Sequence, residues 1–215
     1  MFDRSDRALS SSRKSSHSRS GRPRLVPNIS LLGCVAWLCA FATFTALAQK
    51  APSAKPFERF DRCVLEPDGW TDGDSFRVRL SDGRLETFRL YFVDTTEARS
   101  RGRRSDQQAA YFGLTRHEAI ELGQQAKLFT ARALEKPFTI ETRWRMVFTD
   151  GRHYAIVHTA ASDDLAELLV KNGLARISGV RTPLADGRTS SQDYLAKLKD
   201  LEEHAKNDRL GGWRR

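Results

Sequence analysis

The sequence is poor in cysteine, with only Cys34, Cys39 and Cys63 among its 215 residues. The first two lie in an apolar segment near the N-terminus, so Cys63 is the only thiol in the rest of the chain. A single thiol can form neither an internal disulfide nor a zinc site, which excludes a disulfide-stabilised scaffold and cysteine-based metal binding. We expect Cys63 to be a partly buried strand residue.

Histidines with the spacing of metal ligands are lacking as well, and no internal repeat is visible. The four histidines beyond residue 50 are His117, His153, His158 and His204. Since none has a histidine partner at ligand spacing, we expect them to have surface or structural roles.

Positive charge is in excess, but the excess is smaller in the domain than in the whole chain. Lys and Arg number 36 against 27 Asp and Glu, a formal charge of +9, which favours polyanionic partners. Residues 1–48 hold seven of the basic and two of the acidic residues, leaving 29 against 25, a net +4. This mild excess supports nucleic-acid binding without establishing it.

The N-terminal segment lacks the composition of a folded domain. Residues 1–28 are rich in Ser and Arg, so we expect a disordered basic leader. Residues 29–48 carry no charge and end in Ala-Leu-Ala, as in a secretory signal peptide with its cleavage site, although an uncleaved membrane anchor is the alternative. A linker at 49–56 precedes the domain at 57–215. The protein is therefore expected to be secreted or periplasmic, or else anchored in a membrane and facing outside.

An acidic hairpin organises the domain. Alternating apolar residues at 76–80 and 88–92 flank the turn signal Ser-Asp-Gly-Arg at 81–84. Antiparallel pairing of these strands brings Asp74, at the start of the first, close to Asp94, at the end of the second. Arg89 lies on the face opposite Phe88, so it can flank both carboxylates. A second turn signal at 149–152 offers Arg152 at the start of another apolar strand.

Several separated motifs resemble those of the staphylococcal nuclease (thermonuclease) family, in the same order, over roughly residues 57–213. They are Asp-Gly-Asp-Ser at 72–75, the run 89–97, the run 123–130, Gly-Arg at 151–152 and Asn-Gly-Leu-Ala at 172–175. The resemblance implies that Asp74, Asp94 and the backbone carbonyl of Thr95 bind Ca²⁺.

The resemblance also implies the catalytic residues. Glu97 corresponds to the proposed general base, and Arg89 and Arg152 correspond to the arginines that hold the phosphate. Taken singly, each of these residues could be an ordinary turn, loop or strand residue, but together they fit one metal-assisted hydrolysis site. Asp72 could support the metal indirectly.

Local patterns predict an α+β, mainly β fold: a five-stranded OB-fold barrel with three helices. Strands are expected at 57–65, within 72–93, at 138–145 and at 152–159. One helix is expected at 122–134, with a possible extension back to 116. A second begins at Asp163 and Asp164 and ends at Gly173, and a third begins after the capping residue Ser190 and ends at Gly211.

The chain departs from the family pattern in the parts that would grip the substrate. Asp-Gly-Arg at 150–152 replaces a lysine-tyrosine-glycine-arginine pattern, and Gly179 and Arg181 stand where the staphylococcal enzyme has tyrosines. The arginine-rich segment 98–116 is either a flap that contacts phosphates or a solvated loop.

We therefore expect an exported, calcium-dependent, nonspecific endonuclease that acts on DNA and RNA and leaves 3′-phosphate ends. The alternative is a non-catalytic OB-fold module that binds nucleic acid, as in nuclease-like domains that have lost these acids and arginines. Nucleic acid is the expected partner, with a possible membrane tether through 29–48. No protein partner is implied, and we expect a monomer.

Overall fold

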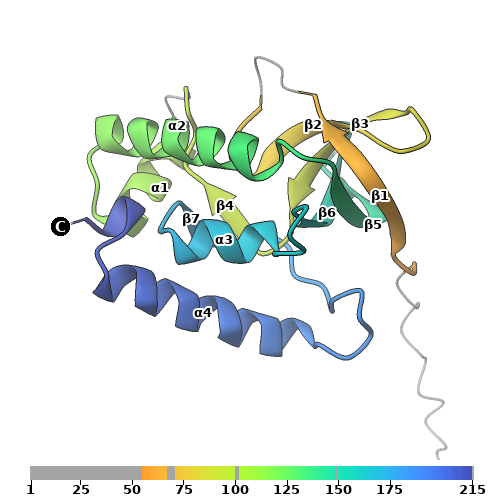
Figure 1. The fold of residues 1–215 in the computed structure, drawn as a ribbon. Helices are drawn as coiled ribbons and strands as arrows, with labels where there is room; N and C mark the ends of the chain where they lie inside the picture. Colours follow the sequence, from red (N-terminus) through yellow and green to blue (C-terminus); the bar gives the residue numbers. More distant parts are fainter. Residues whose placement is uncertain (1–54, 67–70, 100–101, 149, 215) are drawn as a thin grey trace, which may run out of the picture. The chain divides into compact units, whose positions relative to one another are not determined.

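Five strands close into a barrel in the order β1-β2-β3-β6-β5, and four α-helices accompany it (Figure 1). This computed structural model describes residues 55–66, 71–99, 102–148 and 150–214. The barrel strands are β1 Glu58–Leu65, β2 Ser75–Arg79, β3 Leu85–Leu90, β5 Phe138–Val147 and β6 Arg152–His158. Among the strand pairs of the described barrel, β3–β6 is parallel and the others are antiparallel. The expected five-stranded OB-like barrel is thus confirmed.

The expected leader, signal segment and linker at 1–28, 29–48 and 49–56 lie wholly or almost wholly outside the described residues. Within the described ranges, no helix is long and apolar enough to cross a membrane.

The β2–β3 hairpin forms as the alternating pattern predicted. Phe76 pairs with Phe88, and both side chains are buried in the core, whereas the alternate residues Arg77 and Arg79 are exposed. In the turn, Gly83 has φ +88°, a conformation that glycine adopts without steric cost.

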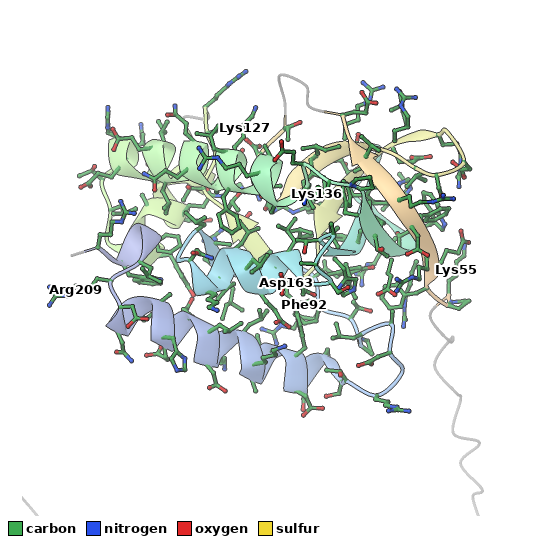
Figure 2. The ribbon with its side chains drawn as sticks, in the orientation of Figure 1. Lys55, Phe92, Lys127, Lys136, Asp163 and Arg209 are labelled. Carbon is green, nitrogen blue, oxygen red and sulfur yellow. The ribbon has the colours of Figure 1, made fainter. Side chains whose placement is uncertain are left out.

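Asp94 belongs to a second, smaller sheet and not to the end of the hairpin, which corrects one expectation. β3 ends at Leu90, and Phe92 has φ +67°, so the chain leaves the barrel there. The next strand, β4 Val93–Thr95, pairs antiparallel with β7 Ala175–Ile177. Phe92 packs against Tyr194 with ring centroids 4.7 Å apart, and Figure 2 labels its position.

Helix α2 spans Arg116–Ala133, so the possible extension back to residue 116 is present. Thr115 and Glu118 form a capping box, because each side chain accepts a hydrogen bond from the other residue's backbone N–H. A Cβ at Gly123 would lie 2.4 Å from the carbonyl oxygen of Thr96. This glycine lets α2 approach the backbone around Glu97.

Helix α1, Arg103–Phe112, occupies the segment expected to be a flap or loop, so the described part of the domain has four α-helices and not three. Its buried residues are Ser105, Gln108, Ala109 and Phe112, which share one helical face. Two of these four are polar, and apolar periodicity therefore could not reveal the helix.

The remaining helices agree with expectation. α3 spans Leu165–Lys171 and is capped by Asp164, and α4 spans Ser191–Asn207 and is capped by Ser190. α3 lies between α2 and α4 (Figure 1). The short 3₁₀ helix Gly211–Trp213 follows, and Trp213 packs on Phe112 with centroids 4.8 Å apart.

Candidate active site

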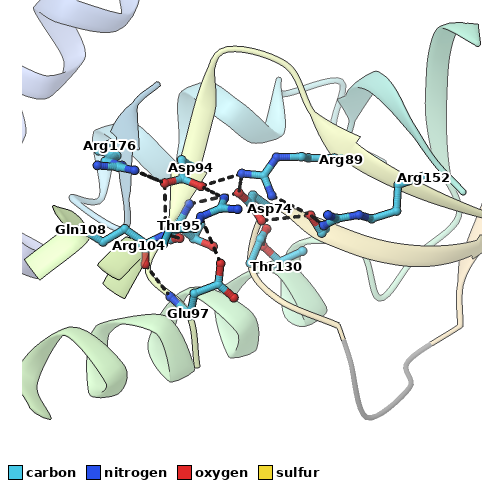
Figure 3. A network of polar contacts seen from close by, with 12 residues as sticks. Asp74, Arg89, Asp94, Thr95, Glu97, Arg104, Gln108, Thr130, Arg152 and Arg176 are labelled. Carbon is cyan, nitrogen blue, oxygen red and sulfur yellow. Dashed lines mark hydrogen bonds and ion pairs between the residues drawn. The ribbon is translucent and has the colours of Figure 1, made fainter. Parts of the chain in front are cut away.

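Arg89 joins the two carboxylates expected to meet. Its Nη2 atom lies 2.7 Å from Oδ2 of Asp74 and 2.5 Å from Oδ1 of Asp94 (Figure 3). All three side chains are buried, with exposed fractions of 9% or less. Asp74 directly precedes β2, Arg89 lies on β3 and Asp94 lies on β4. The barrel and the small sheet together therefore build one buried charge cluster.

Asp94 has more cationic partners than the sequence indicated. Arg104 of α1 also donates to Oδ1, while Arg176 of β7 lies 2.7 Å from Oδ2 through both Nε and Nη2. The amide of Gln108 donates to the same Oδ2 over 3.0 Å. Burial alone would raise the pKa of Asp94, but Arg104, Gln108 and Arg89 hold that pKa at about 2. Asp94 is therefore a firmly ionised group.

The pKa values of Asp74 and Asp72 shift in the opposite direction, upward. Burial raises the pKa of Asp74 against the attraction of Arg89, although Oδ2 also accepts a hydrogen bond from the Thr95 N–H over 3.2 Å. For Asp72, burial followed by repulsion from Glu97 and Asp74 raises the pKa to about 6. Burial thus disfavours the charged forms of Asp72 and Asp74, and a cation bound beside them would stabilise those charged forms.

Gln108 positions the segment that carries the predicted base. Its side chain is fully buried, and its Nε2 donates to the Thr95 carbonyl over 2.8 Å as well as to Asp94. Its Oε1 accepts from the Glu97 N–H over 3.2 Å. One amide therefore ties together three of the predicted site residues. The Glu97 side chain, 24% exposed, lies 3.3 Å from Nε of Arg104 through Oε1.

Arg152 and Arg89 meet on one hydroxyl. Nη1 of Arg152 and Nη1 of Arg89 lie 3.2 and 3.3 Å from Oγ of Ser75, which itself donates to Asp74 over 3.1 Å. Asp150 holds the other side of the Arg152 guanidinium, with Nε at 2.9 Å and Nη2 at 2.5 Å from Oδ2. All six predicted site residues therefore belong to one polar network (Figure 3).

The donor set has the chemistry that a hard cation requires. Two carboxylates converge on a single guanidinium nitrogen, and the neighbouring Thr95 carbonyl is part of the network. The buried Thr95 hydroxyl has no hydrogen-bond partner among the described residues. The guanidinium groups lie where the carboxylates stabilise positive charge. These oxygen ligands are therefore of the type that binds a calcium ion. Across the described part of the chain, no group of three or more His, Cys, Asp or Glu is arranged to hold a metal.

Sequence reasoning missed three residues of the network: Arg104, Gln108 and Arg176. Arg104 stood out only as one of several arginines in the segment 98–116, which was expected to be either a phosphate-contacting flap or a solvated loop. Gln108 lies in a helix that no apolar pattern in the sequence predicted. Arg176 faces Asp94 only through the β4–β7 register, which joins residues 82 positions apart.

The residues outside the site have the ordinary roles that were expected. Cys63 lies on β1 as expected but is fully and not partly buried, and burial raises the pKa of its thiol to about 11. His158 pairs with Glu141 over 3.2 Å. Arg103 and Arg181 are exposed.

The chain matches known proteins over the region that carries most of this network. A family model described as "Staphylococcal nuclease homologue" matches residues 87–215, which include five of the six predicted site residues; Asp74 precedes the match. A relative from Schizosaccharomyces pombe, "Staphylococcal nuclease domain-containing protein 1", is 27% identical over 145 residues. The aligned region covers 66% of this chain but only 14% of that relative.

Proposed function

Because the chain belongs to the staphylococcal nuclease family, we propose that it is a calcium-dependent endonuclease that hydrolyses phosphodiester bonds in DNA and RNA. The domain of this family is a nuclease and nucleic-acid-binding fold. The observation that carries the proposal is the bridge from Arg89 to both Asp74 and Asp94, with Glu97 and Arg152 in the same network.

Each residue has a role that follows from its chemistry. Asp74, Asp94 and the Thr95 carbonyl would hold the calcium ion, which supplies positive charge to a phosphate when bound. Glu97 orients a water molecule and accepts its proton. Arg89 and Arg152 hold phosphate oxygens, because a guanidinium can contact two oxygens at once and stays charged.

The fixed positions of the arginines favour catalysis over simple binding. Hydrogen-bond donors that are held in place before the reaction stabilise developing charge without reorganising. Ser75 and the buried carboxylates hold Arg89, while Asp150 and Ser75 hold Arg152. Cleavage that leaves a 3′-phosphate is part of the proposal, and an enzymatic end-labelling assay of the products would test it.

The proposed test is digestion of single-stranded DNA and of RNA by the purified protein, with calcium chloride or with a chelator. We expect calcium-dependent cleavage, and the Glu97→Gln variant should lower kcat roughly 10²- to 10⁴-fold, as expected for loss of a general base. Glu121→Gln is a matched control, because Glu121 is exposed on α2 and pairs only with His117 among the described residues.

The rival function is nucleic-acid binding without cleavage. One feature favours it: Asp94 already has three arginine partners, Arg89, Arg104 and Arg176. The protein could bind DNA in a mobility-shift assay and fail to cleave it in the presence of any divalent ion that is tested. In that case the binding-module function replaces the nuclease.

Export is a further part of the proposal and rests on the uncharged segment at 29–48. We propose a secreted or periplasmic enzyme, with a membrane-anchored enzyme facing outside as the alternative. N-terminal sequencing of protein recovered outside the cytoplasm separates them, since cleavage after Ala48 leaves Gln49 as the first residue, whereas an anchor retains the apolar segment.

A further inference from the structure

Arg104 is the residue that links the predicted base to a predicted metal ligand. Its Nη2 donates to Oδ1 of Asp94, and its Nε lies 3.3 Å from Oε1 of Glu97. No other residue in the described ranges forms ion pairs with both carboxylates. Figure 3 shows its guanidinium between these two acids.

Exposure separates Arg104 from the other two arginines on Asp94. The side chains of Arg89 and Arg176 are 9% and 16% exposed, whereas that of Arg104 is 46% exposed. A guanidinium already half in solvent loses little when it rotates outward, because water replaces its contacts. Arg104 is therefore the arginine of the three that leaves the cluster at the lowest cost.

The first turn of a helix does not favour an arginine such as Arg104. Arg104 lies in the first turn of α1, where the helix dipole disfavours positive charge, and the N-cap residue Gly102 provides no side-chain cap. The position of Arg104 is therefore set by attraction to Asp94 and Glu97, and not by the stability of the helix that carries it.

Arg89 and Arg104 both donate to Oδ1 of Asp94, so a calcium ion at that oxygen competes with both guanidinium groups, and Arg104, the more exposed of the two, is displaced at the lower cost. We propose that Arg104 is a tethered competitor for the metal: calcium binds only when this guanidinium moves away from Asp94 and Glu97. The inference rests on the proposed function, because it concerns the same metal ligands. Competition by Arg104 would make calcium binding occur at high calcium concentrations and not at low ones.

The test is a calorimetric titration of the purified protein with calcium chloride. The Arg104→Gln variant should bind calcium roughly five- to tenfold more tightly than the parent protein, the size of a modest coupling between two binding events. Arg104→Lys keeps the charge but cannot contact Asp94 and Glu97 through two separate nitrogens, so its calcium affinity should lie between those of the parent and of Arg104→Gln. Thermal unfolding gives a second readout, because a tighter site produces a larger calcium-induced rise in Tm.

Arg103→Gln is the matched control. Arg103 is the preceding residue on the same helix, it is exposed, and it has no ion pair with another described residue. Its removal takes away the same charge at nearly the same place. If Arg103→Gln tightens calcium binding as much as Arg104→Gln, general electrostatics explains the effect and the competition is refuted.

The remaining outcomes separate this inference from the proposed nuclease. Tighter calcium binding by Arg104→Gln alone supports the inference even if no cleavage is found, in which case only the proposed function fails. Equal or weaker binding by Arg104→Gln overturns the inference and leaves a calcium-dependent nuclease intact. If neither the parent nor Arg104→Gln binds calcium, both the inference and the calcium dependence are wrong.

Discussion

The site has two halves that differ in what holds them. On the barrel half, Asp74 and Arg89 lie next to strands whose aromatic and aliphatic side chains, such as Phe76 and Phe88, form the core. On the helix half, Arg104 and Gln108 lie on α1, whose buried face is partly polar. Apolar burial holds the first half in place, whereas the second half combines the packing of Ala109 and Phe112 with hydrogen bonds to the first half.

This difference suggests a division between scaffold and adjustable parts. The barrel half can keep its geometry when a polar contact is lost, because its strands are stabilised independently by the core. The helix half should respond to such a loss by moving. The mutations below test whether the two halves differ in this way, from the largest expected effect to the smallest.

The Arg89→Met substitution should have the largest effect. It leaves Asp74 and Asp94 buried without their shared partner, and breaking a buried ion pair in this way costs about 3–5 kcal/mol. The same change at the half-exposed Arg104 should cost about 1 kcal/mol or less, because solvent screens that pair. Urea denaturation of both variants measures the two free energies of unfolding. Equal losses would contradict the division between the halves.

The Gly123→Ala substitution tests the contact between α2 and the segment around Glu97. Because the new Cβ would lie 2.4 Å from the Thr96 carbonyl oxygen, the backbone must shift, and we expect a cost of about 1–3 kcal/mol. Nuclease activity should fall as well, because Glu97 is the adjacent residue. The control is Gln124→Ala, one position further along and exposed, which should leave both the urea midpoint and the cleavage rate nearly unchanged.

The Gln108→Met substitution keeps the approximate side-chain volume and removes the amide. It leaves the Glu97 N–H and the Thr95 carbonyl without this partner, at a cost of about 1–2 kcal/mol. Since these contacts position the predicted base, kcat should fall more than stability alone explains. Gln107→Met, at an exposed neighbouring position, is the control for cleavage and for chemical denaturation. A variant with full activity would show that α1 does not position Glu97.

The His158→Gln substitution should have the smallest effect and depends on pH. The hydrogen bond to Glu141 raises the pKa of His158 in the folded protein against the opposing effect of burial, and Asp164 adds to the rise. This stabilisation is complete below the pKa of the unfolded chain, about 6.5, and is lost as the pH rises through the higher folded pKa.

Replacing His158 should therefore cost up to about 1 kcal/mol at pH 5.5 and little at pH 8.5. Thermal unfolding at the two pH values measures the difference, with the exposed His117→Gln as control. A loss of stability that is larger at pH 8.5 than at pH 5.5 would contradict the predicted pH dependence.

The candidate site could be predicted in part, and the limit is physical. Asp74, Arg89 and Arg152 follow from turn signals and strand alternation, which act over a few residues. The prediction that Asp94 approaches Asp74 was correct, but the assumed reason was wrong, because β4 pairs with β7 and not within the hairpin. Which residue faces Asp94 depends on that long-range register, which no local pattern specifies.

The sequence by itself determined the local elements of this protein: the hairpin, the helices that begin at Asp164 and Ser190, and the set of acids and arginines that resembles one enzyme family. Each depends on interactions between residues close in the chain. Only the tertiary structure decided that Arg104, Gln108 and Arg176 converge on Asp94. These contacts join separate elements, so their energies depend on how those elements pack and not on the residues next to them in sequence.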